Sequence, residues 1–126
     1  MLFRSGLMDL MADAMSDELD EIIENGIRIR TCGRMHEVPM RTQEVFLGAQ
    51  KRTQDYPGLT FTLAINYGGR AELVDAMRHI ADQAAQGVIK PQEITEDLIG
   101  GNLYWPDVPD PDLLIRTAGE IGRAHV

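Results

Sequence analysis

The most constraining feature of the sequence is an uncharged run, LTFTLAIN at residues 59–66, which is rich in β-branched and apolar side chains and is soon followed by two glycines. A run of this kind is typical of a strand that is covered on both faces, as in parallel sheets. Helical periodicity precedes it over residues 40–53 and follows it over residues 71–86. A buried strand between two amphipathic helices predicts an α/β fold with a mostly parallel sheet flanked by helices.

The rest of the chain continues this alternation. Apolar residues recur at helical spacing over residues 6–25, and IRIRT at residues 27–31 alternates isoleucine with arginine, which predicts a strand with two different faces. A short helix is expected at residues 95–99, and DLLIRT at residues 112–117 predicts a third strand. Because 126 residues suit one domain, we expect residues 1–126 to belong to a single α/β domain.

Charge and cysteine content argue against several functional classes. A formal net charge of -8 does not suit a general nucleic-acid binder, because phosphate contacts need clustered lysines and arginines. Cys32 is the single cysteine, which excludes an internal disulfide and fits a reducing, cytoplasmic setting. His36 and His79 have no partner at metal-ligand spacing. Any anion must therefore be bound locally, by a few residues.

Polar turns that contain glycine follow two of the predicted strands. In NYGGR, Gly68 and Gly69 allow a sharp turn and close approach to a ligand, and Arg70 begins a helix, where free amides favour anions. In IRTAGE, Arg116 lies near a strand end, and its guanidinium can bind two phosphate oxygens. Ligands of parallel α/β sheets bind at the carboxyl ends of strands. The two turns are therefore candidate borders of one phosphate or carboxylate site.

Each of these features also has a purely structural interpretation. A Gly-Gly pair after a strand is more often a tight turn than a ligand site, and Arg116 could equally pair with Asp112 or Glu120. Tyr104 and Trp105 precede a loop rich in proline and aspartate, and we expect them to anchor that loop to the domain. On the residues alone, an unrelated phosphate-binding α/β module is an open alternative.

NYGGR followed by a helix, with PDPDLLIRTAGE further along, resembles the motifs of the cis-prenyltransferases, the undecaprenyl diphosphate synthase or isoprenyl transferase family. The resemblance covers residues 5–120, and SGLMDLMADAMSDELDEIIENGIRIRTCGR is similar to the family's tunnel helix and following strand. It implies a transferase that condenses isopentenyl diphosphate with an allylic prenyl diphosphate in cis geometry. The implied product is a long polyprenyl diphosphate, a cell-wall lipid carrier, made by a cytoplasmic homodimer with transient membrane contact.

The resemblance also implies roles for individual residues. Arg116 would bind the diphosphate of isopentenyl diphosphate, and Asn66 and Arg70 would frame the substrate site. The supporting residues would be Asp112, Glu120, Gly68 and Gly69. A growing prenyl chain needs a hydrophobic tunnel, and the positions that match the family's lining are Leu7, Leu10, Ile27, Leu59 and Phe61. Periodicity alone would assign those five, and Met8, Met11 and Met15, to the core.

The sequence also departs from the family pattern. It has no HMDGN-type motif, whose aspartate binds Mg²⁺ in the family, so we expect the ligands of this cofactor outside these residues and assign no catalytic or metal-binding residue. Residues 1–5 and 121–126 resemble translated sequencing-adapter DNA. We therefore expect an incomplete domain with non-native ends, inactive by itself. The alternative is a non-catalytic partner subunit of a heteromeric cis-prenyltransferase, because such subunits keep the fold and lack the metal-binding aspartate.

Overall fold

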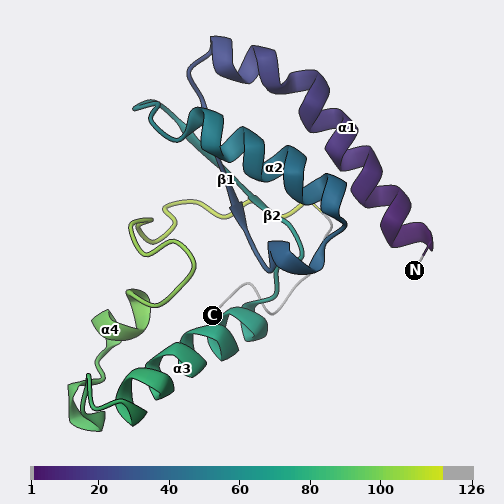
Figure 1. Ribbon diagram of the computed structural model, residues 1–126. Coiled ribbons are helices and arrows are strands. Elements are labelled where there is room, and N and C mark those ends of the chain that lie inside the picture. Colours follow the sequence, from purple (N-terminus) through teal and green to yellow (C-terminus); the bar gives the residue numbers. More distant parts are fainter. Residues whose placement is uncertain (1, 118–126) are drawn as a thin grey trace.

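The computed structural model describes residues 2–117, with side chains from residue 6 onward. In chain order the helices and strands are α1 (Leu2–Glu24), β1 (Arg28–Cys32), α2 (Met40–Thr53), β2 (Thr60–Ala64), α3 (Gly69–Ala85) and α4 (Glu96–Gly100), with short 3-10 turns at Met35–Glu37 and Pro91–Glu93 (Figure 1). Up to residue 100 this order confirms the predicted alternation of helices and strands.

The sheet consists of β1 and β2, which pair in parallel. The register runs from Arg28 opposite Thr60 to Cys32 opposite Ala64. Parallel neighbours need a long crossover connection, and α2 provides it. The pairing confirms the predicted α/β class with a parallel sheet.

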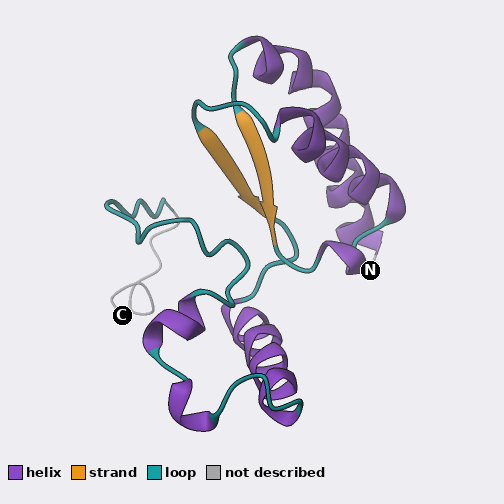
Figure 2. Ribbon diagram, turned by 60° about the vertical axis from the view of Figure 1, so that its left-hand side comes forward, coloured by secondary structure: helices purple, strands orange, loops and turns teal. Residues whose placement is uncertain are grey.

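The predicted third strand at residues 112–117 is wrong. These residues form no strand, and Leu113 and Ile115 are 75% and 74% exposed. Apolar and β-branched side chains favour a strand, but a strand is stable only when its backbone groups pair with a neighbour. Beyond α4 the described chain passes over the sheet face opposite α1 and α2 without joining the sheet (Figures 1 and 2).

The core lies between the sheet and the two helices α1 and α2, which cover the same face (Figure 2). Ile29 of β1 is fully buried there, and Phe46 of α2 is 2% exposed. Met8 and Met15 of α1 are buried in the same cluster, which is the structural role that helical spacing predicts for methionines. The buried stripe of α1 thus consists largely of methionine, whose flexible side chain fills irregular space.

The outer edge of β1 is closed by side chains. The Ile29 N–H donates to Thr53 Oγ1 at 2.8 Å, and the Thr31 N–H donates to Gln50 Oε1 at 2.9 Å. The Thr31 carbonyl accepts from the indole N–H of Trp105 at 2.8 Å. We call this the sealed edge of β1. On the other side of the sheet, no strand among residues 2–117 lies beside β2.

The helices α3 and α4 lie apart from α1 and α2, beyond the carboxyl ends of the strands (Figures 1 and 2). α3 exposes apolar residues, including Leu73 and Met77. It buries Ala76 and Ile80. Its Asp75 accepts hydrogen bonds from Arg34, in the turn after β1, and from Tyr104, in the loop after α4.

Candidate functional site

The turns after β1 and β2 are pressed together at the carboxyl edge of the sheet. Gly33 has a φ of +139°, and a Cβ atom placed on it would lie 1.9 Å from the Ile65 carbonyl oxygen. Only glycine fits this crossing without a backbone shift. The Arg34 N–H then donates to the Asn66 carbonyl at 3.2 Å, which joins the two turns directly. We call this region the polar edge; it comprises residues 33–37 and 66–75.

Asn66 lies at the centre of the polar edge. Its Nδ2 donates to the Arg34 carbonyl at 2.9 Å and to Glu37 Oε1 at 3.0 Å. Its φ of 51° is left-handed, a conformation that asparagine tolerates better than most residues. The structure therefore places this predicted substrate-binding residue at the carboxyl end of β2, with its amide group held from the neighbouring turn.

The NYGGR turn does not use its two glycines for a positive φ. Gly68 is extended, with φ -146° and ψ 133°, and Gly69 is the first residue of α3. The left-handed residue of the turn is Asn66, so neither glycine is needed for a positive φ. A Cβ on Gly69 would meet no atom within 4 Å. The glycines thus leave open space beside the first turn of α3, where Arg70 is exposed.

Arg34 connects the polar edge to α3, a contact that no sequence pattern indicated. Its Nε and Nη2 atoms donate to the two carboxylate oxygens of Asp75 at 3.1 and 2.9 Å. The Tyr104 hydroxyl donates to the same carboxylate at 2.5 Å. The Arg34 hydrogen bonds, followed by the one from Tyr104, lower the pKa of Asp75 to about 2. Asp75 therefore stays ionised at every physiological pH.

A second carboxylate, Glu72, holds Tyr67 and the loop after α4. The Tyr67 hydroxyl donates to Glu72 Oε1 at 2.7 Å, and the Tyr104 N–H donates to Glu72 Oε2 at 2.9 Å. The hydrogen bond to Glu72, together with desolvation, raises the pKa of Tyr67 to about 12. The Tyr67 and Tyr104 rings meet edge to face, with centroids 6.3 Å apart. The aromatic residue of NYGGR is thereby fixed against α3.

The structure separates Arg116 from the position that the sequence predicted for it. Because residues 112–117 form no strand, Arg116 does not lie at the carboxyl end of one, and both Arg116 and Asp112 are exposed. Glu120 lies outside the described residues. The roles of these three residues therefore stay predictions.

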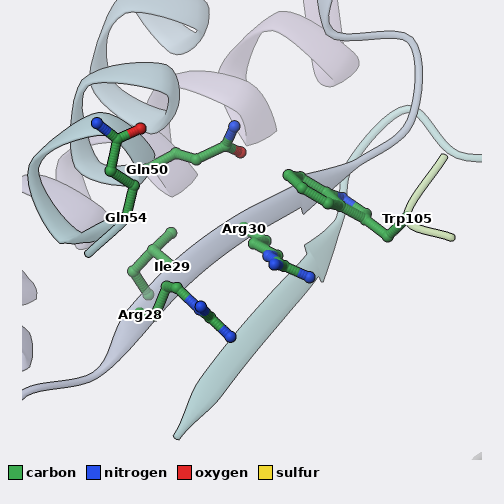
Figure 3. A pocket seen from close by; sticks show the side chains of 6 residues that line it. All are labelled: Arg28, Ile29, Arg30, Gln50, Gln54 and Trp105. Atoms are coloured by element: carbon green, nitrogen blue, oxygen red, sulfur yellow. The ribbon is translucent and has the colours of Figure 1, made fainter. Parts of the chain in front are cut away.

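A small pocket at the sealed edge of β1 shows how the loop after α4 is anchored (Figure 3). It has a volume of about 150 Å³, and Arg28, Arg30 and Trp105 are among its lining residues. The Arg30 guanidinium lies 4.2 Å from the centre of the Trp105 ring and donates to both Asp107 oxygens, at 3.1 and 2.9 Å. These contacts and those of Tyr104 confirm that the two aromatic residues anchor the loop.

An apolar cavity lies between α1 and the sheet. It has two parts, of about 270 and 300 Å³, and Glu18, Ile22 and Phe61 line both. Ile27 and Leu59 also line the second part. Three of the five predicted tunnel residues therefore border one apolar space, and Glu18 is the charged residue among its lining side chains.

The other two predicted tunnel residues lie elsewhere. Leu7 and Leu10 line neither part of the cavity and are 45% and 65% exposed. The face of α1 that meets the sheet is set by its methionines: Met8 is buried, and Met11 and Met15 line the first part of the cavity. Helical spacing identified an apolar face on α1, but the position of its centre depends on packing against α2 and the sheet.

The described residues show neither a metal-ligand cluster nor a membrane-crossing helix. Among residues 2–117, no group of three or more histidine, cysteine, aspartate or glutamate side chains is placed to hold a metal ion. Within the same residues, no helix has the length and apolar character needed to cross a bilayer.

Fold and site together define an α/β protein that combines a polar edge at the carboxyl ends of two parallel strands with an apolar cavity under the same sheet. Residues 4–123 match the model of the family described as "Putative undecaprenyl diphosphate synthase". The chain belongs to this family, the cis-prenyltransferases, as its NYGGR and PDPDLLIRTAGE segments had indicated.

Individual relatives agree with this assignment. The isoprenyl transferase of Clostridium perfringens is 36% identical over 116 residues, which are 92% of this chain and 46% of that protein. The ditrans,polycis-undecaprenyl-diphosphate synthase ((2E,6E)-farnesyl-diphosphate specific) of Micrococcus luteus is 39% identical over 114 residues, 90% of this chain and 46% of that protein. The chain therefore spans less than half the length of these curated relatives.

A solved structure shows the same fold. The lavandulyl diphosphate synthase of Lavandula x intermedia, in complex with dimethylallyl diphosphate, aligns with a TM-score of 0.74 at 28% identity. The alignment covers 77% of this chain and 42% of the lavender protein. The arrangement of helices around the two strands is thus shared with a prenyl diphosphate enzyme.

Proposed function

We propose that this chain is part of an isoprenyl transferase. The full-length parent would condense isopentenyl diphosphate with an allylic prenyl diphosphate in cis geometry, and the product would be a long polyprenyl diphosphate. The relatives that carry this activity in their names cover 90% or more of the chain. The fragment itself would be inactive, because the family's metal-binding aspartate has no counterpart in it.

One observation carries the proposal: the apolar cavity and the polar edge occupy the same strand. Leu63 lines the cavity, and Asn66 follows three residues later at the polar edge. At a rise of about 3.3 Å per residue the two are roughly 10 Å apart. A prenyl diphosphate has an apolar tail and an anionic diphosphate head at this scale. The strand thus offers each end of the substrate a matching environment.

The residues of the polar edge would bind the anionic head. Arg70 lies in the first turn of α3, where the helix dipole and unpaired N–H groups favour a diphosphate. Asn66 would border the site, with its side-chain amide held by a hydrogen bond to the Arg34 carbonyl. Arg116 would bind the diphosphate of isopentenyl diphosphate once residues 112–117 pair with a strand of the parent. Mg²⁺ would be held by groups outside the described residues.

The cavity would hold the growing chain. Ile27, Leu59 and Phe61 present apolar surface to it, and burying a prenyl tail there would gain roughly 25 cal/mol per Å² of apolar surface removed from water. Leu59 and Phe61 are 67% and 51% exposed, so the cavity is open beside them and the tail could lengthen there. In the cell the parent would be a cytoplasmic homodimer. It would contact the membrane transiently and deliver its product there as a cell-wall lipid carrier.

The test is an assay of the full-length parent with labelled isopentenyl diphosphate and an allylic diphosphate. We expect Arg70→Ala to raise KM about tenfold, because it removes a charge-assisted hydrogen bond. We expect Phe61→Trp to shorten the product, because it fills the cavity. Arg41→Ala is the matched control: Arg41 is also exposed, and it pairs with α1, away from the polar edge.

The assay also separates the alternatives. A parent that is inactive alone but stimulates a second cis-prenyltransferase would be a non-catalytic partner subunit. A parent that binds inorganic pyrophosphate but no prenyl substrate would be a phosphate-binding member of the family without transferase activity. Either result would overturn the proposed activity.

A further inference from the structure

Arg34 links three segments that are distant in the sequence. Its backbone makes two hydrogen bonds with Asn66, in the turn after β2. The Arg34 N–H donates to the Asn66 carbonyl at 3.2 Å, and the Arg34 carbonyl accepts from Asn66 Nδ2 at 2.9 Å. Through its side chain it binds α3, with two hydrogen bonds to Asp75 and a longer one of 3.5 Å to the Ala71 carbonyl. One residue of the β1 turn thus fixes both the end of β2 and the start of α3.

The geometry of this link suits positioning rather than general stabilisation. The Arg34–Asp75 pair is bidentate, and the Arg34 and Asp75 side chains are 26% and 32% exposed, so water screens the pair only in part. Asn66 has a left-handed backbone, and its side-chain amide is held by the Arg34 carbonyl and Glu37. Tyr104 donates to the same carboxylate and limits the rotation of Asp75.

We propose that Arg34 is a positioning residue that sets Asn66 and the first turn of α3, with Arg70, for binding the diphosphate head. The inference rests on the proposed function for the identity of the bound group. It does not require Arg34 to touch substrate, because its guanidinium is already turned toward Asp75. Loss of the pair would let α3 shift relative to β2 and separate the two groups that bind one anion.

The experiment is a charge swap in the full-length parent. Arg34→Asp and Asp75→Arg each place like charges opposite one another, and the double variant restores an ion pair of reversed sense. We expect each single variant to raise KM for isopentenyl diphosphate about tenfold and the double variant to return within about threefold of the unmodified enzyme.

A second readout is hydrogen exchange of the backbone amides of residues 66–75. Exchange should quicken about tenfold in each single variant and recover in the swap. Hydrogen exchange can be measured whether or not the parent is an active transferase. A parent without transferase activity would disprove the proposed function, and exchange would then test the positioning role by itself. If Arg34→Asp fails to fold, Arg34→Gln removes the charge without the repulsion and is measured in the same way.

The control separates positioning from stability. Arg41→Asp breaks the ion pairs with Asp9 and Asp13 of α1, which are more exposed than the Arg34–Asp75 pair and lie away from the polar edge. It should lower the melting temperature and leave KM unchanged. If the Arg34 variants behave like this control, with lower stability but normal KM and normal exchange at residues 66–75, the positioning role is refuted.

Discussion

Gly33→Ala is the substitution for which the structure gives the largest expected effect. The methyl group would lie 1.9 Å from the Ile65 carbonyl oxygen, and 2.9 Å from that of Asn66. The φ of +139° is also outside the range that alanine adopts. Such a backbone costs about 1–3 kcal/mol by itself. The overlap is with backbone atoms, so the two turns must separate to relieve it.

The total loss should therefore be about 3 kcal/mol or more in the free energy of unfolding, or roughly 10 °C in melting temperature for a domain of this size. Urea unfolding followed by circular dichroism measures it. Gly48→Ala is the matched control: Gly48 lies within α2, has an ordinary φ, and has no atom within 4 Å of an added Cβ. It should stabilise by about 0.5–1 kcal/mol. Equal effects of the two substitutions would refute the reasoning.

Three further predictions concern the polar contacts. The pKa of Tyr67 is about 12 in the folded chain and about 10 in the unfolded chain, so Tyr67 should contribute stability that is complete below pH 10 and lost as the pH rises toward 12. Glu72→Gln should remove this loss of stability, which urea unfolding at alkaline pH measures. The pKa of Asp75 is about 2 in the folded chain and about 3.9 in the unfolded chain, so Asp75 should contribute stability that is complete above pH 4 and lost as the pH falls through 2. An Asp75→Asn variant whose stability still falls as steeply in acid would contradict this. Arg30→Lys should shift the fluorescence emission maximum of the single tryptophan, Trp105, to longer wavelength. A lysine cannot both cover the indole ring and make two hydrogen bonds to the Asp107 carboxylate. An unchanged emission maximum would argue against the stacked arrangement.

The parts of the fold that depend on local pattern could be predicted from the sequence. Residues 27–31 and 59–66 were identified as strands because alternation and β-branched composition are local properties, and β1 and β2 fall within or beside those ranges. The third strand failed for the opposite reason. The run at residues 112–117 has the right composition, but pairing requires a neighbour that composition does not reveal.

The site divides in the same way. NYGGR marked the carboxyl end of β2, and Asn66 lies there. Arg34 was missed because its importance comes from Asp75, which is 41 residues away in the sequence. Leu7 was assigned to the tunnel from the family resemblance, and among the described residues it lines neither part of the apolar cavity. Contacts between distant segments were therefore the part that the sequence could not supply.

The sealed edge of β1 also limits how copies of this chain can associate. Two-stranded sheets usually offer two sides for added strands, and repeated addition on both sides leads to fibrils. Here the Ile29 N–H and both backbone groups of Thr31, on one side of the sheet, are already bound by side chains. Those side chains belong to Thr53, Gln50 and Trp105. Two copies that met through β2 would form one continuous sheet with a sealed edge at each end. Association by this route stops at a pair, so small soluble oligomers rather than fibrils are the expected aggregate.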